Sequence, residues 1–392
     1  MTKILHPPAK RISKLEPFFF ASIGPRLAEL KTQGYDIIRL DVGSPDLPPH
    51  SKIIKMMALS ASKSSHHGYQ SHRGPTVLRE AWAEMYSREF GVDLDPKSEI
   101  LPLIGSKEGI FHLIITYIQN GDVVLIPDPG YVTYSQATLF SGGEKFQLPL
   151  HPENEFLPIF EGIPNEILVR SKMLWLNYPN NPTSATATLE FFDEAISFAR
   201  INNLLICHDA AYTQVTFEGK NAPSILQIPG AKEVAVEFNS LSKSHNMAGW
   251  RTGAVVGNPN VIENLFSLKS NTDSGHFLPI IDASIAAMTG DQSWLIERNN
   301  IYRKRRDVVV QGLVSMGLTP SIPKASIYVW VEIPPKWNSN DFASEALDQA
   351  HVSMTPGSFF GDYGEGYVRI ALTEPLDRLA IGMERLSNWM SK

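Results

Sequence analysis

Cysteine is nearly absent from this chain of 392 residues, since Cys207 is the only one. A single cysteine excludes a disulfide within the chain and a zinc site built from several thiolates, and it is typical of a protein in a reducing compartment. His208 follows it directly, but no second pair of ligands at metal spacing accompanies the two residues. We therefore expect no metal site.

Long apolar runs and an excess of positive charge are also missing. Residues 1–8 lack the apolar segment of a signal peptide, and no stretch approaches the roughly 20 apolar residues that a membrane helix needs. The 35 Lys and Arg residues against 41 Asp and Glu give a net charge of -6, which offers no basic field for nucleic acid. These absences predict a cytoplasmic protein with no nucleic-acid or membrane partner.

Strand-like and helix-like segments alternate in the middle of the chain. The strand-like segments are nearly continuous apolar runs, and helical stretches such as 107–119, 189–201 and 260–270 lie between them. This alternation predicts an α/β fold whose mostly parallel sheet is covered on both faces. Seven strands are expected, at 99–104, 122–127, 144–150, 172–178, 204–207, 234–238 and 253–256.

The two ends of the chain have a different pattern. After a helix at 291–313, three strand-like pieces (328–333, 351–354 and 367–372) and two helices predict a smaller α+β domain. We expect a division into residues 1–48 (an arm and part of the small domain), 49–285 (the large domain) and 286–392 (the small domain). The helix at 291–313 carries a run of cationic residues, which we interpret as a solvated helix face: Arg298, Arg303, Lys304, Arg305 and Arg306.

The chemistry is predicted by the stretch 240–253, SLSKSHNMAGWRTG, which follows the strand at 234–238. It places Lys243 where a strand ends at the edge of the sheet, as active-site residues of α/β proteins are placed. A buried ammonium tends to lose its proton, and a neutral lysine attacks carbonyl groups. Ser240, Ser242 and Arg251 nearby can hold a phosphate. A lysine that can react with an aldehyde, beside a phosphate site, suggests pyridoxal 5′-phosphate as the cofactor. The alternative is a solvated loop, because a short S-x-S-K motif also occurs by chance.

The whole stretch resembles the lysine signature of class I/II aminotransferases of the aspartate aminotransferase type, which have the pyridoxal-phosphate fold type I. The resemblance implies a Schiff base on Lys243 and a seven-stranded large domain. In DAAY (209–212), it places Asp209 against the ring nitrogen and Tyr212 on the 3′ oxygen, although Asp209 could instead cap a helix. Asn181 of NPTS (181–184) matches a second partner of the 3′ oxygen, with Ser184 in place of a turn glycine.

The resemblance also implies a phosphate cup and a stacking ring. Ser106 and Lys107 of GSKEG (105–109) come after a strand and open a helix, whose amides point toward an anion. Ser240 and Arg251 complete the cup. Tyr131 of PDPGY falls where the family stacks an aromatic ring on the pyridine, although core packing would also explain it.

For the substrate, the resemblance implies Arg369 as the carboxylate clamp, with Gly43 and Asn181 nearby. The alternatives are an edge arginine with its head in solvent, and a plain connector at Gly43. Tyr69 matches the tyrosine that reaches the phosphate of the neighbouring subunit's cofactor. A homodimer with shared active sites is therefore expected.

GSKEG, PDPGY and NMxGW look most like the branch that holds LL-diaminopimelate, aspartate and alanine aminotransferases. Two departures stand out: Phe18 replaces a tyrosine, and His72 with Arg73 stands where diaminopimelate enzymes tend to carry an acid. A cation there would repel a second ammonium and attract a side-chain carboxylate. Arg73 could also turn outward and pair with a surface acid.

We therefore expect a ping-pong aminotransferase that favours aspartate-like or glutamate-like donors and passes the amino group to a 2-oxo acid such as 2-oxoglutarate. An LL-diaminopimelate or alanine aminotransferase is the alternative, and a carbon–sulfur β-lyase on the same fold is a further one. A regulator with an aminotransferase-like domain would need a DNA-binding segment, for which the chain before Lys14 has no room.

Overall fold

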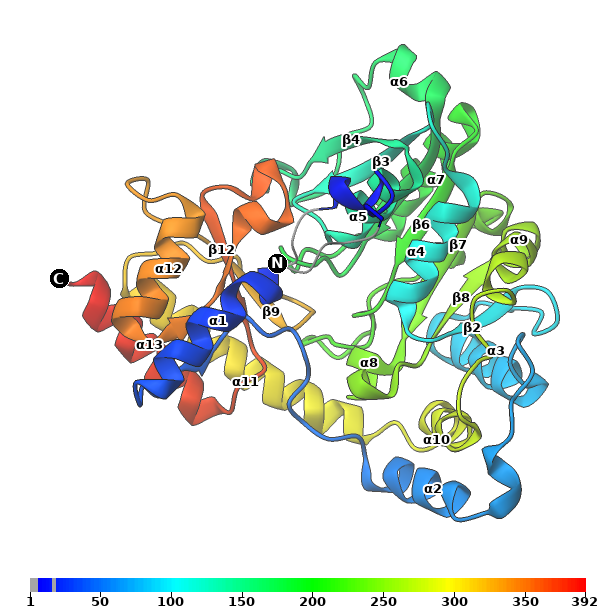
Figure 1. The fold of residues 1–392 in the computed structure, drawn as a ribbon, viewed down its shortest axis with the longest axis horizontal. Helices are drawn as coiled ribbons and strands as arrows, with labels where there is room; N and C mark the ends of the chain where they lie inside the picture. The colour runs from blue at the N-terminus through cyan, green and yellow to red at the C-terminus, as the bar shows by residue number, and fades with distance from the viewer. Residues whose placement is uncertain (1–5, 16–18) are drawn as a thin grey trace.

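A sheet of seven strands, in the order β2-β8-β7-β6-β5-β3-β4, forms the centre of the computed structural model, which describes residues 6–15 and 19–392. β8 runs antiparallel to both of its neighbours, and the other strands are parallel (Figure 1). The bounds are β2 (Ile100–Leu103), β3 (Val123–Asp128), β4 (Glu144–Pro149), β5 (Ser171–Asn177), β6 (Leu205–Asp209), β7 (Ala235–Ser240) and β8 (Gly253–Gly257). The predicted fold class is thus confirmed.

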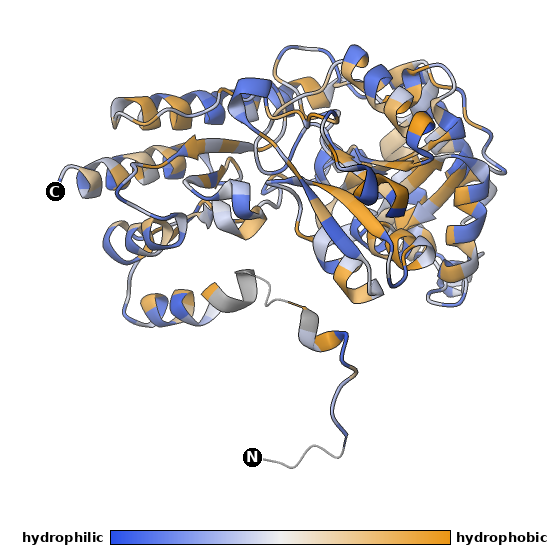
Figure 2. Ribbon diagram, turned by 90° about the horizontal axis from the view of Figure 1, so that it is seen from above, coloured by the Kyte–Doolittle hydropathy of each residue, from blue (hydrophilic) through white to orange (hydrophobic). Residues whose placement is uncertain are grey.

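Helices cover both faces of this sheet, as its nearly continuous apolar strands require. One face packs against α4 (Ser106–Tyr117), α5 (Thr133–Ser141) and α9 (Pro259–Lys269). The other packs against α3 (Thr76–Phe90), α7 (Leu189–Asn202) and α10 (Leu278–Thr289), with α2 (Ser51–Ala61) outside α10. α6 (Asn165–Arg170) and α8 (Leu241–Ser244) are short. Figure 2 shows the hydrophobic colouring concentrated in the strands of this sheet.

A second, α+β part joins the two ends of the chain. β9 (Tyr328–Glu332), β11 (Thr355–Pro356) and β12 (Tyr367–Ala371) form an antiparallel sheet in the order β11-β12-β9. β1 (Ile38–Arg39) pairs in parallel with β10 (Val352–Ser353). The strand predicted at 351–354 contains β10, and the chain then changes its pairing partner, so that β11 follows as a separate strand. The helices are α1 (Phe19–Thr32), α11 (Trp294–Ser315), α12 (Ser339–Ala350) and α13 (Leu376–Met390).

The division at residues 48 and 285 stays a prediction. Among the helices of the described residues, none is long and apolar enough to cross a membrane.

The cationic run of α11 is a solvated face only at Arg303 and Lys304, which are exposed, so the interpretation is wrong for the two buried arginines. Arg298 and Arg305 are 3% and 4% exposed. Arg298 donates to the backbone oxygens of Lys243 (2.7 Å) and Gln214 (3.0 Å). Arg305 forms two 2.7 Å hydrogen bonds with the carboxylate of Asp46 and a third with the backbone oxygen of Leu372. Both guanidinium groups are buried because α11 runs between the two parts of the molecule (Figure 1).

Replacing Arg305 should strongly destabilise the protein. Arg305→Ala leaves the Asp46 carboxylate, itself 25% exposed, without its partner, and breaking a buried ion pair costs about 3 kcal/mol. Urea unfolding followed by circular dichroism measures the loss. Arg303→Ala, at an exposed position of the same helix, is the control and should change the free energy of unfolding by less than about 0.5 kcal/mol. Equal effects of the two substitutions would contradict this account of the helix.

Candidate active site

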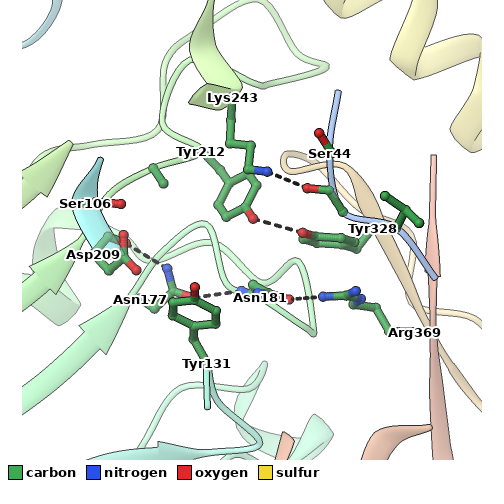
Figure 3. Close-up of a pocket in the computed structure, with 13 residues that line it drawn as sticks. Ser44, Ser106, Tyr131, Asn177, Asn181, Asp209, Tyr212, Lys243, Tyr328 and Arg369 are labelled. Atoms are coloured by element: carbon green, nitrogen blue, oxygen red, sulfur yellow. Dashed lines mark hydrogen bonds between the residues drawn. The ribbon is translucent and has the colours of Figure 1, made fainter. Parts of the chain in front are cut away.

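Polar side chains collect where neighbouring parallel strands end. Asn177 ends β5, Asp209 ends β6 opposite it in the register, and β7 leads directly into the short helix that carries Lys243. The carboxyl ends of parallel strands meet at one edge of a sheet, where α/β proteins bind their ligands. A cavity of about 340 Å³ lies there (Figure 3). Its lining includes eight predicted site residues: Gly43, Ser106, Tyr131, Asn181, Asp209, Tyr212, Lys243 and Arg369.

Lys243 points into this cavity, and its ammonium donates a hydrogen bond to the backbone oxygen of Gly43. Burial, followed by the positive charges of Arg369 and Arg251, lowers the pKa of Lys243 to about 8, against a smaller opposing effect of Asp209. A lysine with this pKa has a far larger neutral fraction at neutral pH than an ordinary one, and the neutral amine is the nucleophile.

Asp209 has one carboxylate oxygen paired and one free. Oδ2 accepts a hydrogen bond from the hydroxyl of Tyr134 (2.9 Å), whereas Oδ1 has no partner among the described residues. Burial raises the pKa of Asp209 to about 6. Asn177 fixes the strand end by donating to the backbone oxygen of Asp209 (2.8 Å). The free, buried oxygen is suited to a positively charged N–H donor from a ligand.

Two aromatic hydroxyls meet across the two parts of the molecule. The Tyr212 hydroxyl lies 3.0 Å from that of Tyr328, at the start of β9. Burial raises the pKa of Tyr131, on the opposite wall, to about 12, so this phenol stays protonated. The Nζ atom of Lys107 lies 5.9 Å from the centre of the Tyr131 ring. The ring of Tyr131 and the hydroxyl of Tyr212 thus both face the cavity (Figure 3).

Arg369 reaches the cavity from β12. It donates to Oδ1 of Asn181 (2.8 Å) and to the backbone oxygen of Asp41 (2.9 Å), and its guanidinium lies 4.2 Å from the centre of the Tyr328 ring. These contacts hold the side chain in place, and Arg369 is only 4% exposed. A fixed guanidinium inside a cavity is the donor geometry that a carboxylate needs.

The predicted phosphate cup lies beside the cavity. Gly105 has a φ of 77°, and a Cβ atom added there would lie 2.2 Å from Nη2 of Arg251, so this backbone and the guanidinium approach closely. Ser106 begins α4, whose first amides point to the same place. Ser240 and Ser242 lie behind it: Oγ of Ser240 accepts from the Ser242 amide (3.2 Å) and donates to the backbone oxygen of Thr252 (3.1 Å). Ser240, Ser242, Arg251 and Lys107 are not among the residues that line the cavity.

Tyr69 and Arg73 do not line the cavity either. Tyr69 is 94% exposed. Arg73 lies over the Phe266 ring at 4.8 Å and pairs with Glu263 at 2.6 Å, which is the outward pairing with a surface acid that the sequence left open. Phe18 lies outside the described residues.

Sequence reasoning missed several residues of the site, among them Asn177, Tyr134 and Tyr328. Asn177 ends the strand beside Asp209, so a polar residue at the end of an apolar strand was the signal. Tyr134 comes one helical turn after Tyr131, and only the folded chain shows that its hydroxyl bonds Asp209. Tyr328 carries no local signal, because the packing of the two parts alone brings it to the cavity. Both ring nitrogens of His208 have partners: Nδ1 lies 2.9 Å from a carboxylate oxygen of Glu237, and Nε2 lies 3.1 Å from the backbone oxygen of Tyr178.

The fold and site define a pyridoxal-phosphate-dependent transaminase of fold type I, and the comparisons agree. A sequence model described as "Aminotransferase class I and II" matches residues 35–386, so the chain belongs to that family. LL-diaminopimelate aminotransferase of Moorella thermoacetica is 47% identical over 98% of both chains. The substrate-bound structure of BacF from Bacillus subtilis has a TM-score of 0.94 at 33% identity and 98% coverage of both chains. An aspartate aminotransferase mutant of Thermus thermophilus has a TM-score of 0.91 at 26% identity, over 98% of this chain and all of that one.

The residues present fit the cofactor of this family, pyridoxal 5′-phosphate. The unpaired Oδ1 of Asp209 offers an acceptor to the ring nitrogen, and the close approach of Gly105 and Arg251 at the start of α4 offers donors to the phosphate. Lys243, with its lowered pKa, offers an amine to the aldehyde. When bound, the cofactor supplies an electron sink for the substrate's α-carbon.

The amine of Lys243 should titrate well below an ordinary lysine. In the cofactor-free protein, the rate of reductive methylation of Lys243, followed by mass spectrometry, should rise with a midpoint near pH 8 instead of 10.5. Arg369→Met should raise this midpoint, because it removes a positive charge that disfavours the ammonium. Lys145, on β4, serves as the internal control in the same digest. A midpoint for Lys243 equal to that of Lys145 would contradict the assignment.

Proposed function

We propose that this enzyme transfers the amino group of LL-diaminopimelate to a 2-oxo acid such as 2-oxoglutarate. The observation that carries the proposal is the relative named LL-diaminopimelate aminotransferase, which is 47% identical over almost the whole of both chains. This favours the alternative that the sequence left open over the expected aspartate-like or glutamate-like donor. That expectation depended on a free cation at Arg73, and Arg73 is paired with Glu263.

The residues take the following proposed roles. The amine of Lys243 would hold the cofactor's aldehyde, and in its neutral form Nζ would take the proton from the substrate's α-carbon. Asp209 keeps the ring nitrogen protonated, and Tyr212 and Asn181 hold the 3′ oxygen. Arg369 orients the substrate carboxylate, with the backbone of Gly43 beside it.

The remaining proposed roles concern the cofactor's ring and phosphate. Tyr131 covers the ring and excludes water from one of its faces. The phosphate is held by a set of donors at the start of α4 and around the lysine: Ser106, Lys107, Ser240, Ser242 and Arg251.

The charge at Arg73 can be tested with donors that differ in charge. Glu263 neutralises Arg73, so the argument against a substrate with a second ammonium loses its force. Glu263→Gln should release the cation and lower kcat/KM for LL-diaminopimelate by about twofold to fivefold relative to alanine, the range of an exposed charge pair. Arg73→Ala should leave that ratio unchanged or raise it.

The assay compares LL-diaminopimelate, aspartate, glutamate and alanine with 2-oxoglutarate in the wild type and both variants. The highest kcat/KM is expected for LL-diaminopimelate. A preference for aspartate or glutamate that Arg73→Ala removes would restore the first expectation. Pyruvate and ammonia formed without any oxo acid would instead indicate β-lyase chemistry.

We further propose a cytoplasmic homodimer in which each active site uses Tyr69 of the neighbouring subunit. Tyr69 is 94% exposed to solvent, and it does not line the cavity of its own chain. Single exposed rings are common on protein surfaces, so the family match of Tyr69 carries this proposal, and the exposure leaves the ring free to reach a partner.

Hybrid dimers test this sharing. Lys243→Ala and Tyr69→Ala should each give nearly inactive homodimers. In a mixed dimer one site carries both changes and the other carries neither, so co-expression should restore up to half of the activity per dimer. Two differently tagged chains isolate the hybrid, and the control is a hybrid of Lys243→Ala with Asp209→Ala, which should stay inactive because both residues belong to the same subunit's site. Absence of activity in the first hybrid would show that Tyr69 acts within its own chain, and an active Tyr69→Ala homodimer would show that it has no role.

A further inference from the structure

An ionic cluster around the buried Lys269 lies at the end of α9, outside the cavity, and the proposed mechanism does not use it. Lys269 is 1% exposed. Its Nζ atom lies 2.6 Å from Oδ2 of Asp273 and 3.5 Å from Oε1 of Glu108, and the same Glu108 oxygen is 2.6 Å from Nδ1 of His112. A buried ammonium is costly unless it is paired, so the placement of Lys269 calls for an explanation.

Metal binding is not the explanation that the geometry favours. Glu108, His112 and Asp273 each offer a ligand atom, and these atoms lie within 4.8 Å of one another. However, the ammonium of Lys269 is already among them and supplies the positive charge that two carboxylates need. The cluster is thus compensated by the chain's own cation.

One side of the cluster is attached to the start of α4. Glu108 lies in the first turn of that helix, two residues after Ser106. Its Oε2 accepts a hydrogen bond from the amide of Ile104 (3.1 Å), the residue that precedes Gly105. The carboxylate of Glu108 therefore ties the entry of α4 to Lys269.

The other side is attached to Arg251. Oδ1 of Asp273 accepts from the amide of Gly275 (3.2 Å), and Nε2 of the next residue, His276, lies 2.7 Å from the backbone oxygen of Arg251. A carbonyl oxygen can only accept, so His276 donates through Nε2. Arg251 has a φ of 58°, a left-handed conformation that a residue with a side chain adopts only when its surroundings hold it there.

We propose that Lys269 and His276 are positioning residues, which set the distance between the start of α4 and Arg251 and so shape the phosphate cup. The inference rests on the proposed function, because it takes Ser106 and Arg251 as phosphate ligands. Neither Lys269 nor His276 lines the cavity, so neither is expected to touch the substrate. Their replacement should weaken the binding of the cofactor's phosphate and leave the reaction of its aldehyde with Lys243 unchanged.

Pyridoxal 5′-phosphate and pyridoxal separate these two effects, since only the first carries a phosphate. The dissociation constants of both are measured by absorbance titration of the cofactor-free protein. Lys269→Met and His276→Leu should weaken binding of the phosphorylated form about tenfold, the loss expected for one hydrogen bond to a charged or fixed group, and should leave pyridoxal binding unchanged. His276→Gln should retain the wild-type value, because a glutamine amide can donate to the same carbonyl.

Two further variants make the result decisive. Arg251→Met removes a proposed phosphate ligand, so it should lower the preference for the phosphorylated form; if it does not, the proposed cup itself is wrong. Arg79→Met removes a mostly buried guanidinium of α3, away from the cup, and should change neither dissociation constant.

The remaining outcomes address the positioning role alone. If Arg251→Met acts as expected but both His276 variants behave like the wild type, Lys269 and His276 do not position the cup. Equal weakening of both ligands by His276→Leu would also overturn the inference, since it would indicate a general loss of structure. The His276 pair decides the matter even if Lys269→Met fails to fold.

Discussion

Two groups of opposite charge, Asp209 and Lys243, lose most of their contact with water at the same edge of one sheet, and the rest of the site depends on this. Burial shifts both toward their neutral forms, to pKa values of about 6 and about 8. The unpaired Oδ1 of Asp209 is therefore a cost of folding that a ligand can offset, and the amine of Lys243 is poised to react with one. A cofactor with a cationic ring nitrogen and an aldehyde complements both.

Most of the fold follows from local sequence patterns. Continuous apolar strands with helices between them have few arrangements other than a parallel sheet covered on both faces, so the seven strands were predictable to within a few residues. The short strand β11 was not, because two residues of pairing leave no pattern. The helices α2, α3 and α10 were not identified, and α10 in particular is apolar on most sides, which obscures helical periodicity.

The residues of the site also differ in how far their positions could be predicted from the sequence. Lys243, Asp209 and Ser106 follow strands, so their positions at the sheet edge follow from chain direction alone. Tyr328 and Tyr134 reach the site through packing between segments distant in sequence or through a side-chain rotamer, which no local pattern encodes. The charge run of α11 was misjudged for a related reason: its spacing does not show that carbonyl groups of both parts of the molecule surround Arg298 and Arg305.

These two arginines give α11 a mechanical role. Arg298 is bonded to the backbone of Lys243, and Arg305, two helical turns later, is bonded to Asp46 and the backbone that follows β12. The helix is thus clamped at one point to the strand edge that carries the lysine and at another to the part that carries Arg369. Any rotation of one part against the other must be absorbed by the two turns between the clamps. Such a rotation would move Arg369 relative to Lys243.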